Sequence, residues 1–420
     1  MLRRRDFLQL LAGEATAASL GAAGNAYQVG VGSSNDPYAA AQRAIAASGQ
    51  FPVAAIAGRT VVVKPNLVEG RPASTGATTD PQVVRAIVDL ALGAGAAGVI
   101  VAEGGVGANP VPFATCGYSF FSTYDSRVQL LDLSTQPYSL VSVPSGLALR
   151  SLYVPSLVLD PKVILISAAK LKTHSNAVVT GSLKNLFNLP VPAQYGVAGK
   201  FLKRQDLHYR GIDECIIDVN LVAGAHYAVI DGIVGMQGDG PLFGQPVTMN
   251  LVLAGANQVA VDRVAVQAMK INQNAVPHLT YGALRGLGPI NLANVTMLGD
   301  TFTPHPFVAA KTPPIIWRPG VSPAAFSPSS GQSASISYGL PNTCMTRAEI
   351  IVDNDASPGI TVVKTIHNWI SKPAGIETVT WAGDTDAGGR AAPGLYLARV
   401  MSTRDTVSIN YATSWVTVTP

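Results

Sequence analysis

The first 300 residues alternate between uninterrupted apolar runs and stretches in which apolar residues recur at helical spacing. The runs RTVVV and VILISAA have the β-branched character of strands buried on both faces, as a parallel sheet covered by helices requires. Between them the pattern predicts a helix with Asp80 as N-cap and Pro81 at its first position. This alternation predicts an α/β domain over residues 27–300, built on a doubly wound, mostly parallel sheet.

Polar residues follow the predicted strands. The strand VILISAA is predicted to end before Lys170, and the next strand is predicted to end at Ile230, just before Asp231. The pattern then predicts a strand to Leu253 and a helix from about Gln258. In an open α/β sheet, ligands bind outside the carboxyl ends of the strands, and the polar residues are expected to gather there.

The chain changes character after residue 300. Residues 301–324 are rich in proline and lack a periodic pattern, which predicts a linker. Residues 325–420 consist of short alternating runs separated by turn residues, as in a β-sandwich. The runs around Trp381 (WAGD) and Tyr396 (PGLY) resemble the immunoglobulin-like module of flagellar hook-capping proteins. That resemblance implies a small all-β sandwich with a structural or docking role.

Residues 1–26 resemble a twin-arginine export signal, in which Arg4 and Arg5 precede a modest Ala/Leu stretch. Arg3 and Glu14 depart from the usual pattern, and a frayed amphipathic helix is the alternative interpretation. The signal predicts a periplasmic or extracellular location by the twin-arginine route.

Composition narrows the class of protein. The 420 residues are 48% hydrophobic and 13% charged, and no apolar run reaches the roughly eighteen residues of a spanning helix. The net charge of +4 does not indicate a nucleic-acid partner. These values favour a compact protein without a transmembrane segment in the mature chain.

The positive charge is local, because eight Lys and Arg residues between Lys162 and Arg210 stand against one acid, Asp206. An anionic ligand would be steered to this region. One group of these bases is expected to form a solvated face: Lys200, Lys203 and Arg204. A second group adjoins apolar segments and donors suited to carboxylate or phosphate: Lys170, Lys172 and Lys184.

The motif TGSLKN, from Thr180 to Asn185, is expected to present backbone N–H groups at a helix start, which is a common anion site. Right-handed crossovers bring strand ends to one edge of a sheet, so the polar residues there should share one crevice. The residues expected to line this ligand-binding crevice are Lys64, Asn66, Glu103, Lys170, Lys172, His174, Lys184, Asn185 and Asp231.

His174, Lys172 and Asp231 are the candidates for catalysis. His174 lies beside two lysines, whose charges would lower its pKa and suit it as a neutral base or ligand. A purely structural role for this histidine is the alternative. Metal binding is a weaker hypothesis, because no spacing such as H-x-x-x-H is present. The weak metal candidates are His174, Asp231, Asp239 and Asp262.

Five motifs, in order, resemble the domain-of-unknown-function family 362 over roughly residues 55–300: KPNLV, KLKTH, TGSLKNLFN, DGIVGMQGDGP and AVD. The resemblance implies no assigned reaction. Some relatives carry ferredoxin-type iron–sulfur modules, but Cys116, Cys215 and Cys344 form no cluster-binding run, so no iron–sulfur cluster is expected. The sequence identifies no other cofactor, and a disulfide between Cys116 and Cys215 stays open.

Two functional hypotheses follow. The first is an exported protein whose α/β domain binds a small anionic ligand or cofactor in the crevice, with enzyme activity left open. The second is a non-catalytic extracytoplasmic binding or structural protein that docks to a protein or surface through residues 325–420.

Overall fold

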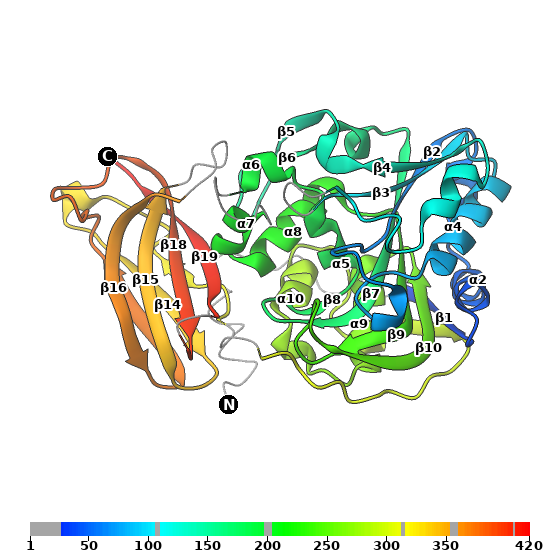
Figure 1. Ribbon diagram of the computed structural model, residues 1–420. Coiled ribbons are helices and arrows are strands. Elements are labelled where there is room, and N and C mark those ends of the chain that lie inside the picture. The colour runs from blue at the N-terminus through cyan, green and yellow to red at the C-terminus, as the bar shows by residue number, and fades with distance from the viewer. Residues whose placement is uncertain (1–26, 106–109, 197–203, 312–315, 353–359, 406–407) are drawn as a thin grey trace.

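The computed structural model describes residues 27–105, 110–196, 204–311, 316–352, 360–405 and 408–420. Residues 1–26, which carry the predicted export signal, lie outside these ranges, as do Lys200 and Lys203. Figure 1 shows the α/β part of the chain on the right and the strands that follow residue 319 on the left.

A nine-stranded sheet in the order β11-β1-β10-β9-β7-β2-β3-β4, with β8 beside β7, forms the centre of the α/β domain. Its strands are β1 (Tyr27–Ser33), β2 (Thr60–Lys64), β3 (Gly98–Glu103), β4 (Val128–Asp132), β7 (Val163–His174), β8 (Val178–Thr180), β9 (Tyr227–Gln237), β10 (Gln245–Gly255) and β11 (Val295–Gly299). Five pairings within this sheet are parallel, whereas β10 runs antiparallel to β1 and β9, and β8 to β7. The predicted α/β class with a large, mostly parallel sheet is confirmed. The doubly wound topology stays a prediction.

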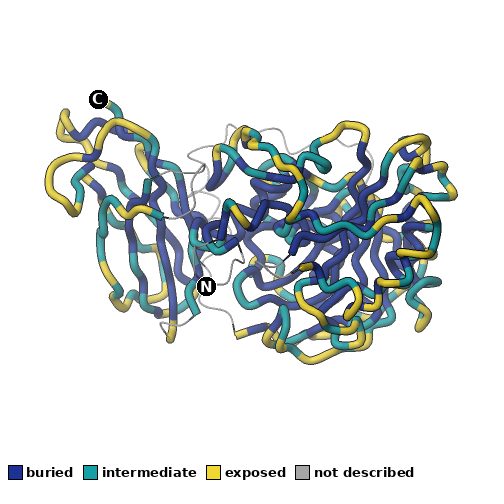
Figure 2. Tube along the Cα trace, turned by 45° about the horizontal axis from the view of Figure 1, so that its top comes forward, coloured by how far each residue is buried: buried dark blue, intermediate teal, exposed yellow. Residues whose placement is uncertain are grey.

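The central strands are apolar on both faces because a hydrophobic core lies on each side of the sheet. All twelve residues of β7 are buried, and Figure 2 shows the buried trace concentrated in this sheet. Side chains of β7 alternate between the two cores, so that Leu165 packs on one side and Ile166 on the other. The uninterrupted apolar run in the sequence reflects this double burial.

Helices cover both faces of the sheet. The core on one face contains residues of α2 (Pro37–Ser48) and α4 (Pro81–Gly93), with α3 (Val53–Ile56) nearby. The core on the other face contains residues of α5 (Ser182–Asn185), α8 (Ile212–Ala223), α9 (Gln258–Ala268) and α10 (Pro277–Leu284). Asp80 caps α4 by accepting from Gln82 N, with Pro81 at the first position, as predicted.

Residues 135–160, which have no clear pattern, form an antiparallel hairpin of β5 (Tyr138–Ser142) and β6 (Ser151–Pro155). The short helices α6 (Pro192–Tyr195) and α7 (Gln205–Tyr209) lie between α5 and α8 in the chain.

Two further sheets follow residue 319. The first has the order β12-β14-β17, and the second β13-β19-β18-β15-β16. Their strands are β12 (Gly320–Ser322), β13 (Ala325–Phe326), β14 (Ala334–Leu340), β15 (Cys344–Val352), β16 (Val362–Lys372), β17 (Gly375–Trp381), β18 (Gly394–Thr403) and β19 (Asn410–Val418). Both sheets contribute to one core, in which Trp381 packs edge-on against Phe326 and Tyr396. The immunoglobulin-like assignment stays a prediction.

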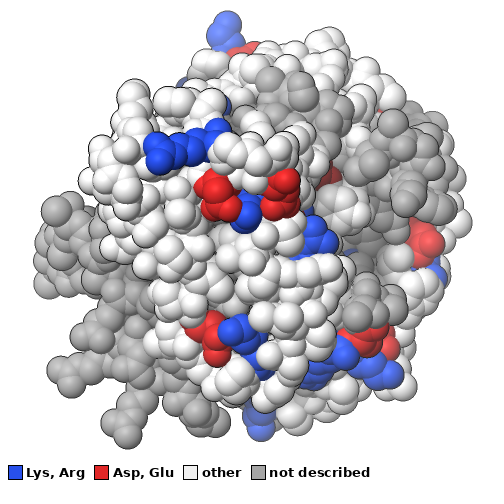
Figure 3. Space-filling model, turned by 90° about the vertical axis from the view of Figure 1, so that its left-hand side faces the viewer, with Lys and Arg blue, Asp and Glu red and all other residues white. Residues whose placement is uncertain are grey.

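Strand β19 packs against α8 of the α/β domain. Thr413 Oγ1 donates to Arg210 O at 2.6 Å, and Trp415 Nε1 donates to Gly146 O at 2.9 Å. Figure 3 views the molecule from the side of the C-terminal sheets and shows small groups of charged side chains of both signs between large uncharged areas.

The segment predicted as a linker packs against both parts of the chain. Phe307 belongs to the core of the α/β domain, and Ile316 belongs to the core of the C-terminal sheets. One end of this proline-rich segment is therefore packed into the α/β core and the other into the core of the C-terminal sheets. The domain boundaries stay a prediction.

Candidate functional site at the carboxyl ends of the parallel strands

Two strands extend further than the sequence predicts, and this changes the local setting of the candidate residues. Strand β7 continues to His174, so Lys170 and Lys172 lie within it. Strand β9 continues past Asp231 to Gln237. The prediction that both strands end before these residues is wrong, because β8 extends the pairing of β7 and β10 extends that of β9.

A buried ion pair joins the ends of β2 and β3. Lys64 Nζ lies 2.5 Å from Glu103 Oε1, and both side chains are fully buried. Burial lowers the pKa of Lys64, while the charge of Glu103 opposes this shift. Glu103 also accepts from the backbone N–H groups of Leu67 and Gly104. The two backbone bonds to Glu103 hold the loops after the two strands in place.

Asn185 of α5 connects this ion pair to the neighbouring strand. Its Nδ2 donates to Lys64 O at 3.0 Å and to Ser167 Oγ at 3.1 Å. Its Oδ1 accepts from Asn66 Nδ2 at 3.0 Å and from Lys64 Nζ at 3.4 Å. These bonds bring four predicted site residues together: Lys64, Asn66, Glu103 and Asn185.

A second buried ion pair joins β7 and β9. Lys170 Nζ lies 2.7 Å from Asp231 Oδ2, and the two residues are register partners in the parallel ladder. Asp231 also accepts from Asp80 N at 2.7 Å and from Ile233 N at 2.9 Å. Asp231 therefore orients Lys170 and the start of α4 at the same time.

Lys172 differs from the two paired lysines. Its side chain is fully buried, and Nζ donates to Ala77 O at 2.5 Å and Pro241 O at 3.5 Å. Among the described residues no carboxylate forms an ion pair with it. Burial lowers its pKa well below 10.5, and the charges of Lys184 and Lys170 lower it further.

His174 is buried, and its Nδ1 accepts from the backbone N–H groups of Asn176 and Ala177, at 3.1 and 3.2 Å. Burial, then the charge of Lys184, lowers its pKa well below 6.5. The ring is therefore neutral with its proton on Nε2. Its Nδ1 has the structural role that the sequence left open, and Nε2–H is a donor.

Lys184 follows on α5 and is partly exposed. Its Nζ lies 5.6 Å from the centroid of the Phe187 ring, in a cation–π arrangement. Burial lowers its pKa to about 8, which the charge of Asp213 opposes. The charge of Lys184 lowers the pKa of both Lys172 and His174, so the three residues lie within electrostatic range.

The start of α5 is not open to an external anion. Ser182 N donates to Asp262 Oδ1 at 2.6 Å, and Leu183 N donates to Asp262 Oδ2 at 3.0 Å. The expected anion site in TGSLKN is therefore occupied by a carboxylate of α9, and that expectation is wrong. Burial raises the pKa of Asp262 to about 6 although both backbone bonds favour its charged form.

The weak metal candidates do not come together. Asp239 accepts from Lys311 N, whereas Asp262 accepts from Ser182 N and Leu183 N. Across the described residues, no group of three or more His, Cys, Asp or Glu side chains has the arrangement of a metal site. Cys116 and Cys215 are buried in different cores and are not bonded to each other.

The prediction of a solvated face is wrong for Arg204. This residue is 1% exposed and donates to Pro190 O, Asn188 O and Gly105 O. Burial lowers its pKa to about 10. This arginine fastens three loop carbonyls, and the charge of Glu103 partly compensates it.

Several groups that complete the network were not predicted. Thr79 Oγ1 accepts from Asn66 N and donates to Ala168 O. Asp80 N donates to Asp231, and Ala77 O accepts from Lys172 Nζ. All lie in the loop before α4. The helix-start signal TTDP marks this loop in the sequence, but backbone groups have no residue signature.

The geometry thus defines an α/β domain with paired and unpaired lysines at the carboxyl edge of a mostly parallel sheet. The family model described as "Domain of unknown function (DUF362)" matches residues 61–267, which include all nine predicted site residues. A thylakoid-associated protein from Synechocystis sp. is 25% identical over 234 residues, which cover 55% of this chain and 70% of the relative.

Solved structures give weaker similarities. The alkylpurine DNA glycosylase AlkC from Pseudomonas fluorescens is 15% identical over 24% of this chain and 28% of its own, with a TM-score of 0.16. A CARDB domain from Pyrococcus furiosus, solved with di-metal ions, is 17% identical over 25% of this chain and 94% of its own, also at 0.16. Scores this low carry no information about the fold.

Within the described part of the chain, no helix combines the length and the apolar character needed to cross a membrane.

Proposed function

We propose that the α/β domain binds a small anionic ligand, a carboxylate or a phosphate, beside Lys172, with Lys184 and His174 completing the binding site. The observation that carries the proposal is a fully buried lysine without an ion-pair partner among the described residues. A buried charge without a partner is costly, so a protein retains such a residue where a ligand supplies the missing charge.

The balance of charges in the network supports this. Lys64 is matched by Glu103, and Lys170 by Asp231. Lys172 and Lys184 contact only carbonyl and aromatic groups, and the opposite charges that act on them from a distance are those of Glu103 on Lys172 and Asp213 on Lys184. One bound anion would compensate these two cations at once.

Anion binding should be linked to proton uptake. In the absence of a ligand, burial and neighbouring cations lower the pKa of Lys172 well below 10.5. An anion next to Nζ would raise that pKa again, because an opposite charge favours the protonated amine. Lys184, the other cation of the proposed site, loses its charge as the pH rises through its pKa of about 8. The affinity for the anion should therefore fall over that pH range.

Among the three candidates for catalysis, Lys172 is the best suited to accept a proton. Both oxygens of Asp231 are engaged by Lys170 and backbone N–H groups. His174 uses Nδ1 as a structural acceptor, so its Nε2–H can only donate while the ring is neutral. An enzyme built on this site would use Lys172 as base and His174 as donor.

Location is a separate part of the proposal. The Arg4-Arg5 pair supports export, and the C-terminal sheets support docking to a surface or partner. Replacing both arginines with lysine should block secretion. Unchanged secretion of that variant would remove the basis for an extracytoplasmic role.

The binding proposal is tested with Lys172→Met and, as a matched control, Lys162→Met. Lys162 is exposed at the opposite end of the same loop–strand segment. Phosphate and acetate are titrated into the full chain while thermal unfolding and proton uptake are measured. A ligand at one hundred times its Kd should stabilise the wild type by about 2.7 kcal/mol.

Stabilisation and proton uptake should disappear in Lys172→Met and persist in Lys162→Met. Equal stabilisation of both variants would show that the anion binds elsewhere, and the proposal would be abandoned.

A further inference from the structure

Lys172 lies under a cover that is made of two segments. Its side chain is fully buried, and the two oxygens that its Nζ contacts, Ala77 O and Pro241 O, belong to different parts of the chain. Ala77 lies in the covering loop, residues 68–78 between β2 and α4. Pro241 lies in the covering turn, residues 238–244 between β9 and β10. An anion that approaches Nζ past Ala77 or Pro241 must displace one of these segments.

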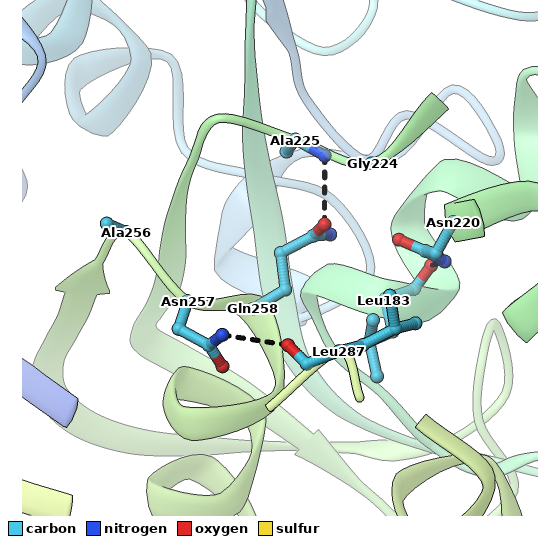
Figure 4. A pocket seen from close by; sticks show the side chains of 8 residues that line it. All are labelled: Leu183, Asn220, Gly224, Ala225, Ala256, Asn257, Gln258 and Leu287. Carbon is cyan, nitrogen blue, oxygen red and sulfur yellow. Dashed lines mark hydrogen bonds between the residues drawn. The ribbon is translucent and has the colours of Figure 1, made fainter. Parts of the chain in front are cut away.

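The groove in Figure 4 does not lead to this lysine. It has a volume of about 200 Å³ and lies between the last turn of α8 and the start of α9. Its lining contains none of the nine predicted site residues, and neither Ala77 nor Pro241. The groove therefore does not open the cover over Lys172.

The covering turn is the fixed part of the cover. Gly240 O accepts from Ser175 N at 3.0 Å, and Gly238 O accepts from Thr173 Oγ1 at 2.8 Å. Gly238 N donates to Val308 O at 2.7 Å. These bonds tie the turn to the end of β7 and to the segment that follows β11.

The covering loop is fastened at its base, whereas its middle contributes to no hydrophobic core. Thr79 N donates to Asn66 O at 3.1 Å, and this bond joins the two ends of the loop. Ala77 is buried, but no residue from 68 to 82, all of which the structure describes, is part of any of the three core clusters. A segment with few buried apolar contacts opens locally with a small free energy, while the rest of the domain stays folded.

Arg71 connects the middle of the covering loop to the covering turn. Its Nη1 donates to Leu242 O at 3.0 Å, and its guanidinium lies 5.3 Å from the centroid of the Phe243 ring. Its Nε donates to Glu69 Oε2 at 2.8 Å, which orients the guanidinium from within the loop. The side chain of Arg71 is 34% exposed and Phe243 is 76% exposed, so water competes for both contacts. Such contacts favour the closed loop but can break and re-form.

We propose that the covering loop is a lid over the anion site, that Arg71 latches it to the covering turn, and that it opens to admit the anion to Lys172. On opening, Ala77 O leaves Nζ and the anion takes its place, while Pro241 O stays on the fixed turn. The inference rests on the proposed function for its ligand, but the movement of the loop can be measured without one.

The test measures how fast N-hydroxysuccinimidyl acetate, a small neutral reagent, acetylates Lys172 in the full chain, by mass spectrometry of the peptide that contains it. Arg71→Leu removes the latch, and Phe243→Ala removes only the ring. Acetylation should be about tenfold faster in Arg71→Leu and about threefold faster in Phe243→Ala. The matched control is Arg127→Leu, which also loses a 2.8 Å ion pair with a carboxylate two residues away, Asp125, and should leave the rate unchanged.

Gly76→Ala provides a variant in the covering loop itself. Gly76 has a φ of 74°, and a Cβ atom there would lie 2.3 Å from Gly235 O on β9. Alanine should therefore push the loop away from the strand and speed acetylation of Lys172. Urea unfolding of each variant distinguishes local opening from a loss of stability of the whole domain.

Acetylation of Lys172 that is unchanged in Arg71→Leu, or that rises only as far as the global stability falls, would overturn the lid. Phosphate is added in a separate arm, where it should slow acetylation of the wild type. If phosphate gives no protection while Arg71→Leu still speeds acetylation, the lid stands and the anion site is refuted.

Discussion

Removing either partner of the buried Lys170–Asp231 ion pair should destabilise the α/β domain, and the two single variants should differ. Asp231 accepts from Lys170 Nζ and Asp80 N, each at 2.7 Å, and from Ile233 N at 2.9 Å. Asp231→Leu removes all three bonds and leaves a buried lysine without its counterion. Lys170→Met leaves the carboxylate with two backbone donors.

The expected sizes follow from these contacts. Breaking a buried ion pair by removing one partner costs about 3–5 kcal/mol. Lys170→Met should lie near the lower end, because two N–H groups still stabilise the carboxylate of Asp231. Asp231→Leu should lie at or above the upper end, because each buried donor left unsatisfied adds about 1–3 kcal/mol. The double variant should cost about 1–3 kcal/mol less than the sum of the single variants, since it leaves no unpaired charge.

Urea unfolding of the full chain, followed by far-UV circular dichroism, measures these differences. The matched control is Asp125→Ala, which breaks the ion pair with Arg127. That pair has a similar length, 2.8 Å, but its side chains are 27% and 45% exposed. The control should change stability by little more than the error of the measurement. An additive cycle, or equal effects of Asp231→Leu and Asp125→Ala, would refute the view that the Lys170–Asp231 pair is stabilised in a water-free interior.

Three further predictions concern the contacts around α8 and α5. Burial raises the pKa of Glu214 well above 4.5, so Glu214 stays protonated in the folded protein at pH values where it ionises in the unfolded chain. The free energy of unfolding should therefore fall as the pH rises above about 4.5, by at most about 1.4 kcal/mol per pH unit. Glu214→Gln should remove this part of the slope in thermal scans, and unchanged slopes would contradict the assignment. At Gly181, a Cβ atom would lie 2.5 Å from Asp262 Oδ1, so Gly181→Ala should displace the α5 cap and cost about 1–3 kcal/mol, with faster hydrogen exchange in α5. Gly93→Ala, where nothing lies within 4 Å of the added Cβ, is the control, and equal losses would argue against the clash. Trp415→Phe keeps an aromatic ring but loses the hydrogen bond to a backbone carbonyl of the α/β domain. It should lower the free energy of unfolding by about 0.5–1.5 kcal/mol and speed proteolysis near residues 301–319. Cleavage at the wild-type rate would mean that this contact does not hold the two parts together.

Local patterns in the sequence predicted much of the fold. The apolar run before Lys170 is a buried strand, the Asp80-Pro81 pair starts α4, and Gln258 starts α9. These features depend on hydrophobic periodicity and on side chains that bond within a few residues, which a single sequence displays. The antiparallel placement of β10 depends on pairing with β1 and β9, and no local pattern records it.

The candidate site was harder to predict, because its key interactions join distant residues. Lys170 and Lys172 lie inside β7, although charged residues usually end a buried strand. One is matched by Asp231 from β9, and the other contacts backbone oxygens that have no residue signature. The burial of Arg204 and the capping of α5 by Asp262 likewise depend on loop and helix placement. The residue types indicated where the polar and charged side chains gather. They did not indicate which of the charged side chains form ion pairs with one another.

The position of β1 has a consequence for synthesis on the ribosome. This strand lies between β10 and β11, and both neighbours come more than two hundred residues later in the chain. At about 5–20 residues per second, translation leaves β1 without its sheet partners for at least about ten seconds. The strand must stay unpaired until Gln245–Gly255 has emerged, and its other edge stays open until Val295–Gly299 follows. Closure of the sheet at this edge is therefore a late event that depends on contacts of high sequence separation.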